Sequence, residues 1–300
     1  MLRSVLCLVL LAAPASAEVP RVVTDLPLTA SLVAEVMGGL GDPDVLLQGG
    51  EDPHHAQLRP SQLRALMGAD LVVWIGPGLS PWLADPIDTA VTAPTLDLSG
   101  IEGQRPILLA PEDEADDHDG EGHPDHGGID PHLWLDPGNV VLWLRAIGAA
   151  LAAADPDHAA HYATRTEAAV AATLALQADL AEILEPVGDR GLVMFHDAYG
   201  YFARAYGLRI VATVTDSDAT APGAAHLSAL RAGLADSGAV CLFPEANHAD
   251  DFARVVIEGT TLRLGAPLDP EGMAMDGGPD LYPRLMRALA AAIADCAAGR

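Results

Sequence analysis

Short β-rich runs alternate with helical patterns along two separate stretches of this chain, and this repetition limits the possible folds more than any other feature. In the first stretch the β-rich runs are residues 22–23, 45–47, 71–75 and 95–98, with helical patterns such as 28–37 and 60–67 between them. A second series follows Gly191, at residues 192–195, 210–214, 240–243 and 261–264. Strands that alternate with helices favour parallel sheets. The sequence therefore predicts an α/β protein with two lobes built on parallel sheets.

A long helical pattern separates the two stretches. Residues 157–184 are almost entirely Ala, Leu, Glu, Gln and Thr, with Asp155 and Pro156 before them and Pro186 and Gly188 after them. One helix of this length measures about 42 Å. We expect a rigid connector over 155–187 that joins an N-terminal lobe, 18–154, to a C-terminal lobe, 188–300. One more helix packed within a layer remains the alternative, which the unusual length disfavours.

The first seventeen residues have the pattern of a secretory signal peptide. Arg3 supplies a positive charge, residues 5–13 are apolar, and Ala15-Ser16-Ala17 is a small-residue cleavage signal. We expect cleavage after Ala17 and a soluble exported product without a lipid anchor. The longest later apolar run, 140–154, is interrupted by Arg145 and is shorter than a membrane span requires.

The charge balance excludes some partners and favours others. The chain has 42 acidic and 16 basic residues, a net charge of −26, and 11 histidines. Such a charge repels nucleic acid, so we expect no nucleic-acid partner. Imidazoles and carboxylates are the ordinary ligands of divalent metals, so the composition favours cation binding.

One acidic segment, 112–128, belongs to neither lobe. It has almost no apolar residues, so we predict a loop on the surface of the N-terminal lobe. Its histidines, His118, His123 and His126, are candidates for accessory metal binding. A solvated loop with incidental histidines remains the alternative.

Cys241 and Cys296 are the cysteines left after removal of the leader. In an oxidising compartment two cysteines favour one disulfide, which would join the C-terminal helix to a core strand. Two buried free thiols are the alternative.

Four residues that can bind metal follow predicted strands, two in each lobe. Ligands of open parallel sheets bind beyond the carboxyl ends of the strands, so these positions are favoured. They are His54, His132, His196 and Asp269. Three imidazoles and one carboxylate would form a tetrahedral site suited to Zn²⁺. Glu245, which follows another strand, is the second choice for the carboxylate or a residue that orients an imidazole.

Five motifs resemble those of periplasmic metal-binding proteins that serve ABC importers for zinc and manganese. They are the segments 49–61, 69–78, 131–137, 195–202 and 265–270, in the order found in that family. The resemblance covers nearly the whole mature chain. It implies two Rossmann-like lobes, a long rigid connecting helix, and metal bound between the lobes by His54, His132, His196 and Asp269. It also implies an inner-membrane ABC permease as partner and a disulfide between Cys241 and Cys296.

Within this resemblance the third ligand position favours zinc. Manganese carriers typically have Glu where this chain has His196, and nitrogen ligands favour zinc over the harder manganese ion. We expect a monomer that captures Zn²⁺ in the periplasm, performs no bond chemistry, and has a periplasmic metallochaperone as a further candidate partner. A manganese carrier, a zinc hydrolase, which needs an open coordination position, and a structural zinc or adhesion protein are the alternatives.

Overall fold

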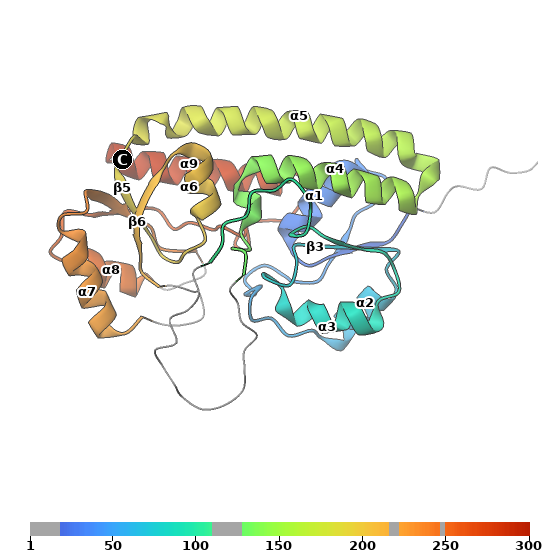
Figure 1. The fold of residues 1–300 in the computed structure, drawn as a ribbon, viewed down its shortest axis with the longest axis horizontal. Coiled ribbons are helices and arrows are strands. Elements are labelled where there is room, and N and C mark those ends of the chain that lie inside the picture. Colours follow the sequence, from blue (N-terminus) through green and yellow to red (C-terminus); the bar gives the residue numbers. More distant parts are fainter. Residues whose placement is uncertain (1–18, 110–127, 216–221, 247–249) are drawn as a thin grey trace, which may run out of the picture.

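The structure is a computed structural model that describes residues 19–109, 128–215, 222–246 and 250–300 (Figure 1). The predicted leader, 1–17, lies outside these residues, and so does nearly all of the predicted acidic loop with His118, His123 and His126.

The N-terminal lobe is built on a four-stranded parallel sheet. Its strands are β1 (Val22–Thr24), β2 (Asp44–Val45), β3 (Leu71–Trp74) and β4 (Thr95–Asp97), in the spatial order β2-β1-β3-β4. All four residues of β3 are buried, as expected where helices cover both faces of a parallel sheet. Leu71 and Val73 face the core beneath α1 (Pro27–Met37), whereas Val72 and Trp74 face the core beside α2 (Pro60–Met67) and α3 (Pro81–Ala90).

The C-terminal lobe repeats this arrangement. Its strands are β5 (Gly191–Met194), β6 (Arg209–Thr213), β7 (Ala239–Leu242) and β8 (Arg263–Leu264), parallel and in the order β6-β5-β7-β8. Its helices are α6 (Gly200–Tyr206), α7 (Ala224–Leu234), α8 (Asp251–Ile257) and α9 (Leu281–Ala298). In both sheets the first strand lies between the second and the third. The prediction of two α/β lobes with parallel sheets is confirmed.

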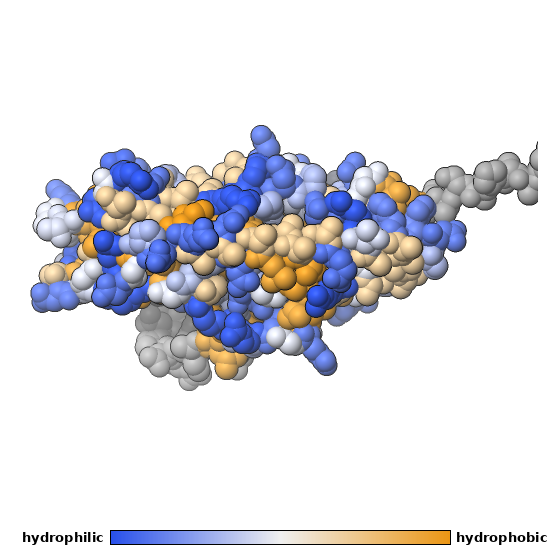
Figure 2. Space-filling view, turned by 90° about the horizontal axis from the view of Figure 1, so that it is seen from above, coloured by the Kyte–Doolittle hydropathy of each residue, from blue (hydrophilic) through white to orange (hydrophobic). Residues whose placement is uncertain are grey.

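A single long helix, α5 (Ala159–Leu184), runs along both lobes (Figure 1). Its 26 residues span about 39 Å. It packs against α4 (Pro137–Ala154) and α1 of the first lobe and against α9 of the second. The predicted long connector is thus present, as a helix supported along its length by both lobes. Figure 2 shows the molecule from the side on which α5 lies, where hydrophilic and apolar residues are mixed.

The helix begins two residues later than the pattern 157–184 suggested. Asp155 accepts a hydrogen bond from the backbone N–H of His158 (3.3 Å), and residues Pro156–His158 form a 3-10 turn. A second 3-10 turn, Glu185–Val187, follows the helix. The residues 155–187 therefore comprise one α-helix with a tighter turn at each end.

Helix α4 is longer than the apolar run 140–154 indicated. It begins at Pro137, because Asp136 accepts a hydrogen bond from the N–H of Gly138 (2.9 Å) and proline is favoured in the first turn. With 18 residues it is, among the described residues, the one helix long and apolar enough by composition to cross a membrane. Its buried side chains, which include Trp143 and Ile147, belong to the core of the lobe, and core helices commonly have this composition.

The predicted disulfide between Cys241 and Cys296 is present. It joins β7 to α9, with a Cα–Cα distance of 6.2 Å. Both cysteines are buried in the larger core cluster, so the bond fixes the last helix to the C-terminal sheet.

Candidate metal centre

His132 lies in the segment that enters α4, buried and held by a neighbouring carboxylate. Asp130 Oδ1 accepts a hydrogen bond from the His132 backbone N–H (3.0 Å) and lies 2.8 Å from His132 Nδ1. The other ring nitrogen, Nε2, has no hydrogen-bond partner among the described residues, although the residue is only 4% exposed. A buried polar atom without a partner is costly, so this nitrogen is suited to a ligand from outside the protein.

His196 directly follows β5, and a carboxylate holds it in the same way. Its Nδ1 lies 2.5 Å from Glu245 Oε1, which also accepts a hydrogen bond from the Tyr199 hydroxyl (3.0 Å). Glu245 follows β7, the neighbouring strand, and all three side chains are buried. A carboxylate at Nδ1 fixes the ring orientation and favours Nε2 as the metal-binding atom. Of the two roles considered for Glu245, these contacts favour orientation of an imidazole.

His54 lies in the loop that follows β2. Asp52 Oδ1 accepts a hydrogen bond from the His54 backbone N–H (2.8 Å), and Trp82 Nε1–H donates to the carbonyl of Pro53 (2.8 Å). The ring centroid of His54 is 5.7 Å from that of His132, which is 5.5 Å from that of His196. The structure therefore brings the three predicted histidines together, with His132 in the middle. His55 is exposed, with its ring centroid 6.5 Å from that of His54.

Asp269 lies at the same cleft, where both of its carboxylate oxygens accept backbone hydrogen bonds. Oδ1 accepts from the N–H of Met273 (3.0 Å) and Oδ2 from the N–H of Ala274 (2.9 Å). Burial raises the pKa of the Asp269 carboxyl, and these hydrogen bonds oppose the rise. Its predicted role as a metal ligand stays a prediction.

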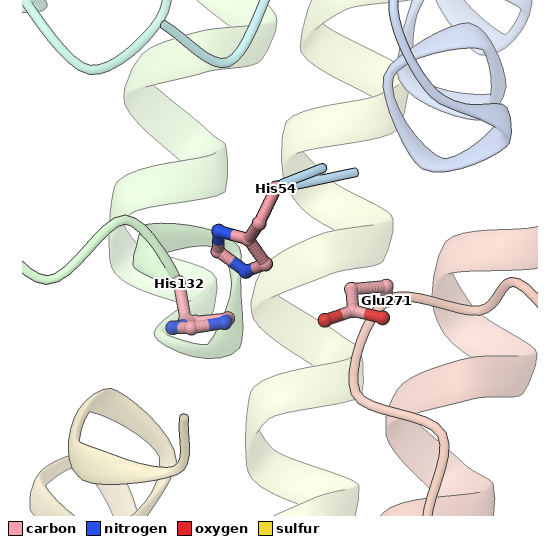
Figure 3. A group of neighbouring side chains, drawn as sticks. All are labelled: His54, His132 and Glu271. Atoms are coloured by element: carbon pink, nitrogen blue, oxygen red, sulfur yellow. The ribbon is translucent and has the colours of Figure 1, made fainter. Parts of the chain in front are cut away.

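Glu271 is a candidate ligand that the sequence did not reveal. The buried carboxylate has an oxygen within 4.8 Å of a ring nitrogen of His54 and of His132 (Figure 3). In Figure 3 the three side chains, from separate loops, point toward one another. The only signal in the sequence was the position of Glu271 two residues after Asp269, and nothing in that spacing distinguishes which carboxylate faces the histidines.

The cleft beside these residues is formed by both lobes. Its lining comes from two segments of the chain, one in each lobe, together with the loop after β7: Gly50, Glu51, Asp52, Pro53, Glu245, Ala246, Leu268, Asp269, Pro270 and Glu271. Half of these residues carry a carboxylate. The negative field of such a cleft raises the local concentration of cations without selecting among them.

The described residues that flank the predicted acidic loop are hydrogen-bonded to each other, a few residues before His132 in the sequence. Leu109 N–H donates to the carbonyl of Gly128 (3.0 Å), and Asp130 N–H donates to that of Ile107 (2.8 Å). Tyr201, on α6 of the other lobe, donates its hydroxyl to the Asp130 carbonyl (2.9 Å) and accepts from Ile107 N–H (3.0 Å). The described residues on either side of 110–127 are therefore hydrogen-bonded to each other and to α6, close in sequence to one of the candidate ligands.

The remaining described histidines have structural contacts away from the cleft. His158 Nδ1 lies 2.7 Å from Asp155 Oδ2, His161 Nε2 lies 2.9 Å from the carbonyl of Met37, and His226 Nε2 lies 3.1 Å from that of Val214. His248 lies outside the described residues. These contacts agree with the expectation that His158, His161 and His226 are ordinary residues.

Two parallel α/β lobes joined by a long helix, with candidate metal ligands between them, are the arrangement of solute-binding proteins, and solved structures share this fold. A crystal structure of ZnuA superposes with a TM-score of 0.77 at 24% identity, covering 93% of this chain and 99% of that one. The periplasmic zinc-binding protein TroA from Treponema pallidum gives a TM-score of 0.78 at 23% identity, covering 93% and 99%.

Sequence comparison shows the family. Residues 22–296 match the model of the periplasmic component A of zinc-uptake complexes, ZnuA, and the chain belongs to this family. It is 45% identical to the high-affinity zinc uptake system protein ZnuA of Paracoccus denitrificans, over 95% of this chain and 94% of that protein. The protein of the same name from Brucella abortus is 34% identical, over 89% and 88%.

Proposed function

We propose that this protein captures Zn²⁺ in the periplasm and delivers it to an ABC permease, with the metal held between the two lobes. The observation that carries this proposal is the convergence of three imidazoles, two from the N-terminal lobe and one from the C-terminal lobe, beside a carboxylate-rich cleft. Family membership and the names of the relatives from Paracoccus and Brucella support the same function.

The spacing of the rings fits a shared metal ion. Zinc binds histidine nitrogen at about 2.0–2.1 Å, which places ring centres about 3 Å from the metal and about 5 Å from one another. The observed centroid distances of 5.5 and 5.7 Å are close to this value. His54 and His132 also belong, with Glu271, to a group whose ligand atoms lie within 4.8 Å of one another, and His196 would complete the set around the bound ion.

The donor set favours zinc over manganese. Three nitrogen ligands and one oxygen ligand suit a borderline ion in tetrahedral geometry, whereas manganese prefers oxygen ligands in larger number. The carboxylates at Nδ1 of His132 and His196 increase the basicity of both rings, which strengthens binding to zinc further.

Four protein ligands favour transport over hydrolysis, because a catalytic zinc keeps one position open for water. In the proposed cycle the leader Met1–Ala17 directs export, and the mature monomer binds zinc and transfers it to the inner-membrane permease. The acidic loop would bind further zinc weakly through His118, His123 and His126 and raise the rate of capture.

A pair of histidine variants tests this proposal. His196→Ala removes a proposed ligand, whereas His55→Ala removes an exposed imidazole from the same cleft region and serves as the matched control. We expect a loss of zinc affinity of at least about 100-fold for the first, since even the outer partners of metal ligands are worth about 10- to 100-fold. The second should remain near the wild-type value. Competition with a zinc chelator measures both, and equal effects of the two variants would contradict the proposed ligand set.

A further inference from the structure

The loop 268–274 contacts the segments of two proposed histidine ligands, His54 and His132. Gly50 N–H, four residues before His54, donates to the carbonyl of Met273 (2.9 Å). Trp134 Nε1–H, two residues after His132, donates to the carbonyl of Pro270 (2.7 Å). These two hydrogen bonds join the N-terminal lobe directly to this loop of the C-terminal lobe.

The same loop is also tied to the group that orients His196. Glu245 and Leu268 form a parallel β-bridge, in which Ala246 N–H donates to the Leu268 carbonyl (2.8 Å) and Leu268 N–H donates to the Pro244 carbonyl (2.9 Å). The loop thus lies beside the segments of His54 and His132 and beside the carboxylate that holds His196.

Asp269 shapes this loop. Its carboxylate accepts the N–H groups of Met273 and Ala274, so the chain closes into a turn around it. The turn passes through Gly272 at φ +73°, a backbone conformation that residues other than glycine rarely adopt. A Cβ at this position would also lie 2.9 Å from Leu285 Cδ1. Within this turn Asp269 points toward backbone N–H groups, while Glu271 points toward His54 and His132 (Figure 3).

Three other carboxylates of the cleft contact a guanidinium group, backbone N–H groups or the Nδ1 atom of a histidine. Glu51 pairs with Arg59 and accepts from Gln48 N–H (2.8 Å). Asp52 accepts from the backbone N–H of His54, and Glu245 contacts His196 Nδ1. Glu271 is the carboxylate whose oxygen lies within 4.8 Å of two candidate ligand nitrogens.

We propose that Glu271 supplies the carboxylate ligand of the zinc site and that Asp269 is a positioning residue that holds the turn presenting it. This assignment rests on the proposed function. It replaces Asp269 by Glu271 in the set of ligands that the sequence predicted. It also gives the site a means of assembly from both lobes, because the Glu271 turn is hydrogen-bonded to the loops of His54 and His132.

Three variants of the mature protein test the assignment through zinc affinity and the visible absorption of bound Co²⁺. Glu271→Gln removes the proposed ligand and keeps the size of the side chain. Asp269→Asn keeps one acceptor for the turn. Glu182→Gln, the matched control, removes an equal charge at an exposed position on α5, away from the cleft.

We expect Glu271→Gln to lower zinc affinity at least about 10-fold and to change the Co²⁺ spectrum, because the geometry around the metal changes. Asp269→Asn should weaken binding less and keep the wild-type spectrum, and Glu182→Gln should leave affinity unchanged. A Glu271→Gln variant with wild-type affinity and spectrum would overturn the assignment. A changed spectrum for Asp269→Asn alone would show that Asp269 is the ligand. Wild-type protein that binds no zinc would overturn the proposed function itself.

Discussion

Two buried carboxylates determine which nitrogen His132 and His196 present to the cleft. Asp130 and Glu245 each lie at an Nδ1 atom, so Nε2 is the nitrogen that would bind the metal in the proposed site. The Asp130 contact is local, two residues from its histidine. The Glu245 contact joins the ends of two neighbouring strands, so only the parallel order of β5 and β7 brings it about.

At this scale the sequence predicted the clustering of the histidines but not the details of the carboxylates. His54, His132 and His196 follow strands or prolines, and the ends of parallel strands meet at one edge of a sheet. The orientations of Asp269 and Glu271 depend on a turn through Gly272 and on hydrogen bonds between the lobes. No pattern within the segment reveals such contacts, which is why Glu271 was missed.

Replacement of Glu245 tests the role of the orienting carboxylate. Glu245→Gln should lower zinc affinity by about 10- to 100-fold, because the ring of His196 loses the negative partner that fixes and polarises it. Glu182→Gln, at an exposed position on α5, removes the same charge far from any proposed ligand and should leave affinity unchanged. Chelator competition measures both variants. A Glu245→Gln protein with wild-type affinity would show that this contact is not needed for binding.

Helix α5, which joins the two lobes, packs closely against α4 of the first lobe. The Cα of Gly148 on α4 approaches Thr166 on α5 so closely that an added Cβ would lie 2.1 Å from Thr166 Oγ1. The composition of residues 157–184 predicted the long helix, because its residues have high helix propensity. The close contact with α4 could not be predicted, since it depends on which faces of two distant segments meet.

Gly148→Ala tests this packing. We expect the free energy of unfolding to fall by about 1–3 kcal/mol, because the new methyl group must push the two helices apart. Gly233→Ala on α7 is the matched control, since a Cβ there meets nothing within 4 Å, and it should be neutral or more stable by up to about 1 kcal/mol. Urea denaturation measures both. Equal stability of the two variants would contradict the close approach of α4 and α5.

The start of α5 has its own charge cluster. Burial raises the pKa of Asp155, but hydrogen bonds with His158 and Tyr162 outweigh it, so the pKa of this carboxyl lies below its ordinary value. Because the pKa is lower in the folded protein, ionised Asp155 stabilises the fold fully when the pH is above the pKa of the unfolded state, about 3.9. This contribution is lost as the pH falls from there through the lower pKa of the folded state.

Asp155→Asn should therefore destabilise the protein in a pH-dependent way. At pH 7 and 5 we expect a loss of about 1–3 kcal/mol, the cost of leaving buried partners unsatisfied. At pH 3 and below the difference from wild type should shrink, because the carboxyl group then binds a proton in the unfolded protein more readily than in the folded one. Denaturant unfolding at the three pH values measures this. A difference that stays constant or grows toward pH 3 would show that the charge of Asp155 is not what stabilises the start of α5.

Across the whole molecule, two similar sheets are held by one helix and share one cleft. The repetition of β-rich runs predicted both sheets, and their identical strand order follows from the same connection pattern. The relative placement of the lobes could not be predicted, since it arises from the packing of α5 on α4 and α9 and from hydrogen bonds such as that of Trp134 to Pro270. The net charge of −26 attracts cations in general, whereas in the proposed site selectivity for zinc would rest on the few residues between the lobes.

A crystal structure of the zinc-loaded protein, with anomalous scattering recorded at the zinc edge, tests the central claim most directly. The account predicts one strong anomalous peak between the lobes, about 2.0–2.2 Å from a ring nitrogen of His54, His132 and His196 and from a carboxylate oxygen of Glu271. A peak bound by other residues, with these three histidines more than about 3 Å from the metal, would contradict it.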